Sequence, residues 1–564
     1  MMKNRSLRTN IAEAIPVLLV LIICNIYMCA YKLHLGTYFD EVTYVATGDM
    51  FRRGAIFLKD NWYILQFIAV FMTPIVRCYE AVNGSLEGVV FFVRVVFILI
   101  QSLVAFLSYL EFKHHVSNRT ATIAAIVIYS YVPYMYSIHY RTVANWCLLG
   151  CVVLLLSFYR KPAFWKSVLL GLFISGASVA FETAAIVIIP VSIALIQLCR
   201  DKDSSKRDIR LHLFLIWGIC ICCASCLLAP TIIEEGWTGF ITDFRHFFDS
   251  ETHTENILQK LPRMLPPLFL AFVGGWLAEF LFDKIQKKRA VRYDGFIAVI
   301  LSLLVAIFII LRPQSVTISR VNYWMLFIFF LTIFMVRRLD KQVQFIYLNI
   351  FLLPTIFFMA AIMMATNLGI AVVGCACIIS LVFLILISDQ RFLNLRTTSL
   401  VIPIVMISAS CLLVMNTFGA TTVFARYSPI ISSGSMKGTQ TSSEYEYDLI
   451  VNTEKVVKKY VKENDSLFLY VRWANPSGYL DGDERIYATP SVEGYFNHKG
   501  TIVPDFFLGN ARRRPTIAII NTDDLPCAID EYLSDYPLGQ YIRRCKTEET
   551  IDNGYAVFRL KTDM

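Results

Sequence analysis

Charged residues are scarce in this sequence. They make up 17% of the 564 residues, against about 25% in ordinary soluble proteins. Apolar residues make up 56% of the chain and occur in long uninterrupted runs. These features exclude an ordinary soluble enzyme. They also exclude a disordered scaffold, a collagen-like fibre and a small disulfide-stapled domain.

Several nucleotide-binding and catalytic motifs are also absent from the sequence. It contains no P-loop, no GxGxxG, no HExxH and no kinase signature. The first two motifs cradle phosphates, and HExxH provides zinc ligands with a general base. ATP-driven chemistry and a Rossmann site for a nucleotide sugar are therefore not expected within this chain.

The apolar runs predict a mainly α, polytopic membrane protein, because a helix of about 20 apolar residues spans a bilayer. The first run follows three cations and has no small-x-small cleavage site, so it is predicted to be a span rather than a removable signal peptide. We predict about 13 transmembrane helices, at 11–31, 88–110, 120–138, 145–159, 166–181, 183–199, 211–231, 264–282, 294–311, 322–336, 343–365, 368–388 and 397–418.

The positive charges predict the orientation of these spans. With the N-terminus in the cytoplasm, most Lys and Arg of the short loops lie on the inner side, as the positive-inside rule requires. The four short outer connections hold only Arg141, Arg312 and Arg320. The positive charge of the inner loops thereby explains most of the net charge of +9. The sequence predicts a multi-pass protein of the cell membrane, and no nucleic-acid partner is needed to explain its charge.

Three longer segments then lie on the outer face. They are the loops 32–87 and 232–263, and a tail from about 420 to the end. We therefore divide the chain into a transmembrane domain, 1–419, and an extracytoplasmic domain, 420–564. An amphipathic helix at 448–464 and short β-rich runs in the tail predict a small α/β domain. Cys527 and Cys545 could pair there, which the sequence leaves open.

Candidate chemistry is concentrated in the first outer loop, in Asp40-Glu41-Val42-Thr43-Tyr44. A carboxylate at the membrane interface is partly desolvated, which raises its basicity. Such a group can remove a proton from an acceptor hydroxyl or amine. The alternative is a solvated acidic loop. After Asp40, apolar residues at helical spacing predict a helix lying on the membrane, ended by Gly54, and the stretch Trp62 to Val76 predicts a second surface or re-entrant helix.

Further candidates lie near the outer ends of the spans. Arg94 could hold a lipid phosphate with its planar fork, or it could extend to the interface as an anchor. The segment 243–253 could bind a divalent cation through histidine and carboxylate, or it could be an exposed amphipathic helix. A polar crown around an outward-facing cavity is predicted from Arg141, Asn145, Glu182, Arg312 and Arg320.

On these residues the chain resembles the GT-C superfamily of membrane glycosyltransferases. It is most similar to the protein O-mannosyltransferases and the bacterial transferases that add aminoarabinose to lipid A. Those families carry an Asp-Glu pair in the first outer loop followed by Tyr, as in Asp40-Glu41-Val42-Thr43-Tyr44. A surface helix ending in Gly follows, as at Met50 to Gly54, and an arginine such as Arg94 opens the second span.

The resemblance implies a function and a set of roles. A sugar carried on a polyprenyl phosphate would be the donor, and a lipid, glycan or protein the acceptor. Asp40 would be the catalytic base of an inverting transfer, with Glu41 in support. Substrate binding would involve Tyr44, Arg94, Arg141, Asn145 and Arg320, and a divalent metal would join Asp60 to His253, with His246 as the alternative histidine.

Two other functions stay open at the sequence level. One is transport or export of a lipid-linked glycan, which would need polar residues through the depth of the membrane. The other is an assembly protein without transferase activity, whose tail binds surface polymers. Because ionisable residues lie mostly at span ends, the sequence favours the transferase.

Overall fold

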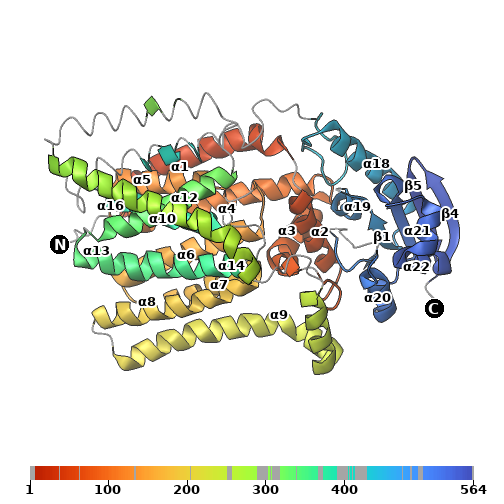
Figure 1. Cartoon of the computed structure of the whole chain (residues 1–564), viewed down its shortest axis with the longest axis horizontal. Helices are drawn as coiled ribbons and strands as arrows, with labels where there is room; N and C mark the ends of the chain where they lie inside the picture. Colours follow the sequence, from red (N-terminus) through yellow and green to blue (C-terminus); the bar gives the residue numbers. More distant parts are fainter. Residues whose placement is uncertain are drawn as a thin grey trace.

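Helices dominate the computed structural model of the chain. The structure describes residues 7–36, 39–62, 64–132, 135–202, 205–249, 257–288, 318–337, 339–365, 373–389, 428–472, 474–482, 486–492 and 499–561, with short pieces at 303–304, 307, 404–405, 407–409 and 411–412. The helices form a bundle, and a small α/β domain lies against one end of it (Figure 1).

The bundle is built from long apolar helices. Its elements are α1 (Leu7–Ala30), α4 (Val89–Phe112), α5 (Asn118–Ser130), α6 (Tyr140–Arg160), α7 (Phe164–Ala180), η3 (Glu182–Val187), α8 (Ile188–Asp201), α9 (Lys206–Asp249), α10 (Ile257–Lys288), α12 (Ile318–Val336), α13 (Lys341–Ile346), η5 (Tyr347–Leu352), α14 (Leu353–Ala365), η6 (Gly374–Cys377) and α16 (Ile378–Ile387).

Six helices among the described residues are long and apolar enough to cross a membrane. Three shorter apolar helices, Phe164–Ala180, Arg320–Val336 and Ile378–Ile387, accompany them. A membrane-embedded protein is therefore supported by length and composition. The predicted number of 13 spans is not confirmed, and the spans predicted at 294–311 and 397–418 lie largely outside the described residues.

The first long loop folds into two helices, as its apolar spacing predicts. They are α2 (Phe39–Arg52) and α3 (Ala69–Asn83), with a 3-10 turn, η2 (Ile64–Ile68), before α3. Two carboxylates, Asp40 and Glu41, occupy the first turn of α2 and Arg52 its last turn, which suits the helix dipole. Gly54 follows with φ of +90°, a conformation that ends the helix at little cost in glycine.

The environment of α2 differs from the prediction. A helix lying open on a membrane surface was expected, yet every residue from 41 to 50 is buried within the protein. The reason is that α3, α4 and α19 (Asn475–Asp481) pack around it. The loop is thus enclosed between the bundle and the C-terminal domain (Figure 1).

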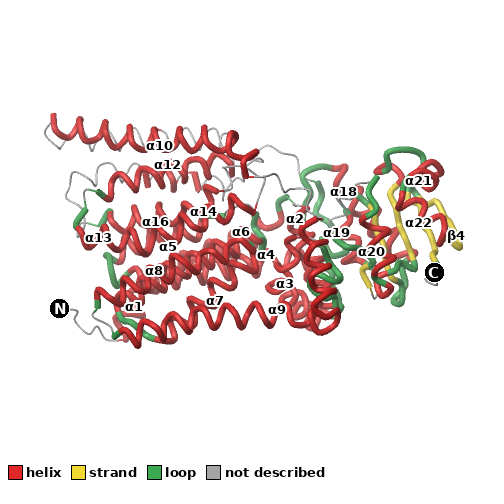
Figure 2. The backbone as a smooth tube through the Cα atoms, turned by 60° about the horizontal axis from the view of Figure 1, so that its bottom comes forward, coloured by secondary structure: helices red, strands yellow, loops and turns green. Residues whose placement is uncertain are grey.

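The C-terminal domain, residues 428–561 where described, is a three-layer α/β sandwich (Figure 2). Its sheet has the order β2-β1-β3-β5-β4, with β1, β2 and β3 parallel and β5 antiparallel to both β3 and β4. The strands are β1 (Ser466–Tyr470), β2 (Ile486–Tyr487), β3 (Ile517–Asn521), β4 (Lys546–Asp552) and β5 (Tyr555–Leu560).

Helices cover both faces of this sheet. Alternate strand residues point to opposite faces, so Leu467 and Leu469 join one apolar core while Phe468 and Tyr470 join another. The remaining helices of the domain are α18 (Glu444–Tyr460), α20 (Ile502–Gly509), α21 (Ile529–Asp535) and α22 (Pro537–Cys545). The predicted α/β domain is confirmed, and the thiols of Cys527 and Cys545 are free.

Candidate functional site

The N-terminal end of α2 is fixed by a buried ion pair between Glu41 and Arg94. Arg94 Nε lies 2.7 Å from Glu41 Oε1, and Arg94 Nη2 lies 2.6 Å from Oε2. The two side chains are 1% and 3% exposed. The same guanidinium donates to the carbonyls of Leu33 and Gly36. One arginine on α4 therefore fixes both the start of α2 and the chain that leads into it.

The observed contacts of Glu41 and Arg94 hold the start of α2 in place. The guanidinium of Arg94 faces Glu41 and backbone carbonyls. The predicted role of Arg94 in holding a lipid phosphate and the predicted catalytic support by Glu41 both stay predictions.

Asp40 precedes Glu41 in the same helical turn and is half-buried. Tyr44 lies four residues later, and side chains four apart on a helix are neighbours about 5–6 Å apart at Cβ. The Tyr44 ring contacts two rings at the start of α6, with centroids 5.0 Å from His139 and 6.1 Å from Tyr140. The face of α2 that carries Asp40 thus meets the N-terminus of α6.

The start of α6 is polar although it lies inside the bundle. His139 is the N-cap and accepts a hydrogen bond at Nδ1 from the backbone N–H of Arg141, at 3.1 Å. Burial, with the nearby charge of Arg141, holds the pKa of His139 well below its ordinary value. The ring is therefore neutral near pH 7, and the hydrogen bond to Nδ1 leaves its proton on Nε2.

Asn145 lies four residues after Arg141 and is 7% exposed. Among the described residues, neither its amide nitrogen nor its amide oxygen has a hydrogen-bond partner, and the hydroxyl of Thr142, one turn earlier, has none either. Buried polar groups without partners are rare and call for an explanation. Arg141, also buried, donates from Nε to the hydroxyl of Tyr140 at 3.0 Å.

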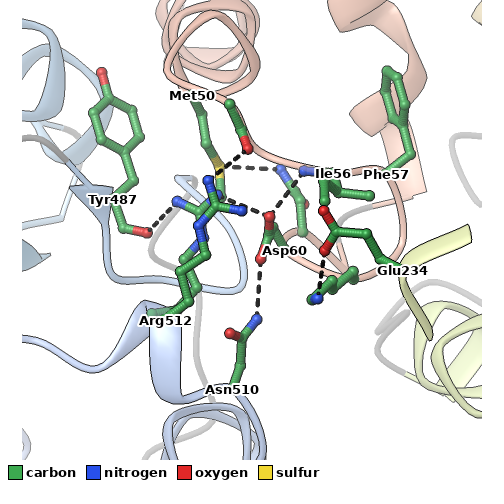
Figure 3. Close-up of polar contacts among 12 residues, drawn as sticks. Met50, Ile56, Phe57, Asp60, Glu234, Tyr487, Asn510 and Arg512 are labelled. Carbon is green, nitrogen blue, oxygen red and sulfur yellow. Dashed lines mark hydrogen bonds and ion pairs between the residues drawn. The ribbon is translucent and has the colours of Figure 1, made fainter. Parts of the chain in front are cut away.

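The structure describes only one of the two predicted metal ligands, Asp60 and His253. Asp60 is fully buried, and both of its carboxylate oxygens are engaged. Oδ2 lies 3.0 Å from Arg513 Nη2 and accepts the amide N–H of Ile56 at 2.9 Å, while Oδ1 accepts from Asn510 Nδ2 at 3.0 Å. Asp60 lies at the centre of these contacts in Figure 3.

This arrangement does not fit Asp60 as a metal ligand, because its oxygens already pair with a cation and two N–H donors. His253 lies outside the described residues. Among the described residues, no three His, Cys, Asp or Glu side chains form a group that could hold a metal. A divalent cation therefore stays a prediction.

The second long loop does reach the first. The helix α9 changes direction at Gly236, where φ is +65°. Just before this kink, Glu234 accepts a hydrogen bond from Lys59 Nζ at 2.8 Å, and Glu235 pairs with the same ammonium. Thr231 donates to the carbonyl of Phe57 at 2.6 Å. The proximity of the two loops that a shared metal site implies is thus seen at Lys59, while residues 250–256 of the second loop lie outside the described residues.

Of the other predicted residues, Arg320 lies in the first turn of α12 and is exposed, His246 lies in the last turn of α9, and Arg312 lies outside the described residues. Sequence reasoning missed His139, Asp49, Tyr487 and Arg513. His139 carried a weak signal, as a polar residue directly before an apolar helix, where N-caps occur. The other three make contacts between segments more than 400 residues apart, which no local pattern predicts.

No protein-family model matches the chain, and no curated protein is significantly similar to it. Functional inference for this chain therefore rests on its own residues and their geometry.

Proposed function

We propose that the chain is a membrane glycosyltransferase that moves a sugar from a polyprenyl-phosphate donor to an acceptor at the outer face of the cell membrane. The alternatives are a lipid-linked glycan exporter and an assembly protein without activity. The observation that carries the proposal is the meeting of α2 and α6. A half-buried carboxylate, Asp40, lies one helical turn from Tyr44, whose ring contacts His139 and Tyr140 at the start of α6.

In this proposal Asp40 is the general base. It takes a proton from the acceptor's hydroxyl or amine, whose lone pair attacks the anomeric carbon of the donor. The bond from that carbon to the phosphate oxygen breaks, and the polyprenyl phosphate leaves with the electron pair. Inversion at the anomeric carbon follows, because attack and departure take place on opposite faces of the sugar.

The buried polar groups of α6 support a sugar as ligand. The amide of Asn145 offers a donor and an acceptor side by side, and Thr142 offers a hydroxyl. Sugar hydroxyls both donate and accept, so they can complete these hydrogen bonds. An unpartnered buried amide costs free energy in the free protein, and a ligand that satisfies it recovers that cost on binding.

Removing the base tests the proposal. Asp40→Asn keeps the size of the side chain and cannot accept a proton, so transfer should fall by about 10²- to 10⁴-fold. The measurement is transfer of radiolabelled mannose, glucose or arabinose from polyprenyl phosphates into membranes of cells that lack the chain. Asp208→Asn is the matched control, because Asp208 lies near the start of α9, outside the proposed site.

Two outcomes would contradict this mechanism. If Asp40→Asn retains full transfer activity, Asp40 is not the base. If the wild-type chain in vesicles moves a lipid-linked sugar across the bilayer without transferring it, the export alternative replaces the enzyme.

A further inference from the structure

The first long loop covers an edge of the C-terminal sheet. Strand β2 is the outermost strand on its side of the sheet, and an uncovered edge strand exposes unpaired backbone groups. The loop reaches this edge through its backbone, where the amide of Trp62 donates to the carbonyl of Pro490, just beyond β2, at 2.9 Å. The Trp62 ring packs against Phe506 of α20 in the core of the C-terminal domain.

A buried ion pair reinforces this contact. Asp60 and Arg513 are 0% and 2% exposed at their side chains. Arg513 also donates from Nη1 to the carbonyl of Tyr487 in β2 at 3.2 Å. The neighbouring Arg512 reaches back to the carbonyl of Gly54, at the end of α2, at 3.2 Å (Figure 3). The Asp60–Arg513 pair therefore connects the first long loop to the edge strand β2 and to the segment before β3.

The C-terminal end of α2 is held directly by the same strand. Asp49 is fully buried and accepts a hydrogen bond from the hydroxyl of Tyr487, which is also fully buried. Asp49 further pairs with Arg52 at 2.6 Å and with Arg53 at 2.7 Å. The guanidinium of Arg53 lies over the Tyr487 ring, 5.4 Å from its centroid.

These contacts place restraints at both ends of one helix. The bundle holds the start of α2 through Arg94 and Glu41, and the C-terminal domain holds its end through Tyr487 and Asp49. Asp40 and Asp49 are nine residues apart, which is about 13–14 Å along a helix at 1.5 Å per residue. Movement of the C-terminal domain against the bundle would therefore tilt the helix that carries Asp40.

We propose that the C-terminal domain positions Asp40, and that Arg513 and Tyr487 are positioning residues acting through Asp60 and Asp49 on α2. The inference rests on the proposed function of Asp40. It assigns a role in catalysis to the C-terminal domain, although the proposed base lies on α2. A domain that only docks for stability would make the same contacts but would not affect the chemical step.

The test uses the full chain in lipid nanodiscs and two readouts. In Arg513→Met, we expect kcat for transfer from the labelled polyprenyl phosphates to fall at least 10-fold. The KM for the donor should stay within about two-fold, because the donor's own contacts are unchanged. Amide hydrogen exchange in Phe39–Arg52 should become at least 10-fold faster, and Arg513→Lys should recover part of both effects.

A matched control lies inside the C-terminal domain. Arg559 binds both oxygens of Asp465, at 2.7 and 2.8 Å, and the carbonyl of Tyr460, all within that domain. Arg559→Met should perturb the domain and leave both kcat and the exchange of α2 within two-fold of wild type. If Arg513→Met does not fold, Tyr487→Phe tests the same restraint by removing a single hydroxyl, with the same expected direction in both readouts.

The outcomes separate the two proposals. Unchanged exchange of α2, or unchanged kcat, in folded Arg513→Met and Tyr487→Phe would overturn the positioning role. An equal loss of kcat in Arg559→Met would overturn it as well. If the wild-type chain transfers none of the labelled sugars, the proposed function fails, while faster exchange of α2 would still establish that the C-terminal domain holds this helix.

Discussion

The buried pair of Glu41 and Arg94 allows a sharp test of whether Glu41 acts in chemistry or in structure. Glu41→Gln keeps the side-chain size and removes the negative charge, which leaves the Arg94 guanidinium buried without a counter-ion. Breaking a buried ion pair by removing one partner costs about 3–5 kcal/mol. The helices α1 to α8 cover residues 7–201, and for a cooperative unit of this size 1 kcal/mol corresponds to about 2–4 °C in Tm. Glu41→Gln should therefore lower Tm by roughly 6–20 °C.

The assay is thermal unfolding of the full chain in detergent, followed by intrinsic fluorescence and by the loss of monodisperse protein. Glu41→Gln combined with Arg94→Gln should recover more than half of the lost stability, because two neutral amides can hydrogen-bond to each other without a buried charge. The control is Glu234→Gln. Glu234 pairs with Lys59, their side chains are 43% and 21% exposed, and Lys59 keeps Glu235 as a partner, so screening by water limits the expected loss to about 1 kcal/mol. If Glu41→Gln abolishes transfer and leaves Tm within 1 °C of wild type, Glu41 is a catalytic residue and the structural assignment is wrong.

Two further predictions follow from buried polar groups. Asn145→Leu should raise stability by about 1–2 kcal/mol while lowering sugar transfer, because it removes a buried amide that has no partner in the described part of the chain. A drop in Tm would show that the amide is bonded in the free protein. Burial, with the nearby charge of Glu454, raises the pKa of Asp481 to about 7. A carboxyl group with a raised folded-state pKa binds its proton more tightly in the folded chain, so the C-terminal domain should lose stability as pH rises from about 4 through 7. Amide exchange of α19 at pH 5 and pH 8, corrected for intrinsic rates, measures this change, and Asp481→Asn should remove it; equal protection of wild type at the two pH values would contradict the assignment.

Local patterns predicted the elements of the fold more reliably than their surroundings. The helix over Phe39–Arg52 followed from its apolar spacing and from Gly54. The position of this helix did not follow from the sequence, because an apolar helix face packs equally well against lipid or against protein. In this chain α19, more than 420 residues later, covers α2 and buries it. The β-rich runs at 467–473, 516–520 and 556–560 predicted the strands β1, β3 and β5 with slightly different bounds, whereas the two-residue β2 and the polar β4 lack that signal.

The candidate site also combines residues that the sequence could select with contacts that only the tertiary structure shows. Asp40, Glu41 and Arg94 could be selected from the sequence, because charges beside long apolar runs are costly and therefore conspicuous. The ion pair could not be predicted, because Asp40 and Glu41 are adjacent carboxylates and the sequence does not say which of them contacts Arg94. The structure assigns Glu41 to the arginine and leaves Asp40 half-buried beside Tyr44.

The sequence by itself determined that the chain is membrane-embedded, that it ends in an α/β domain, and that its first long loop carries an acidic pair. These features depend on composition and short-range periodicity, which are properties of consecutive residues. Only the tertiary structure decided that Asp60 pairs with Arg513, that Tyr487 reaches Asp49, and that His139 and Tyr140 lie beside Tyr44. Those contacts depend on how distant segments pack, and a buried charge or amide is stabilised by whichever partner that packing brings within hydrogen-bond distance.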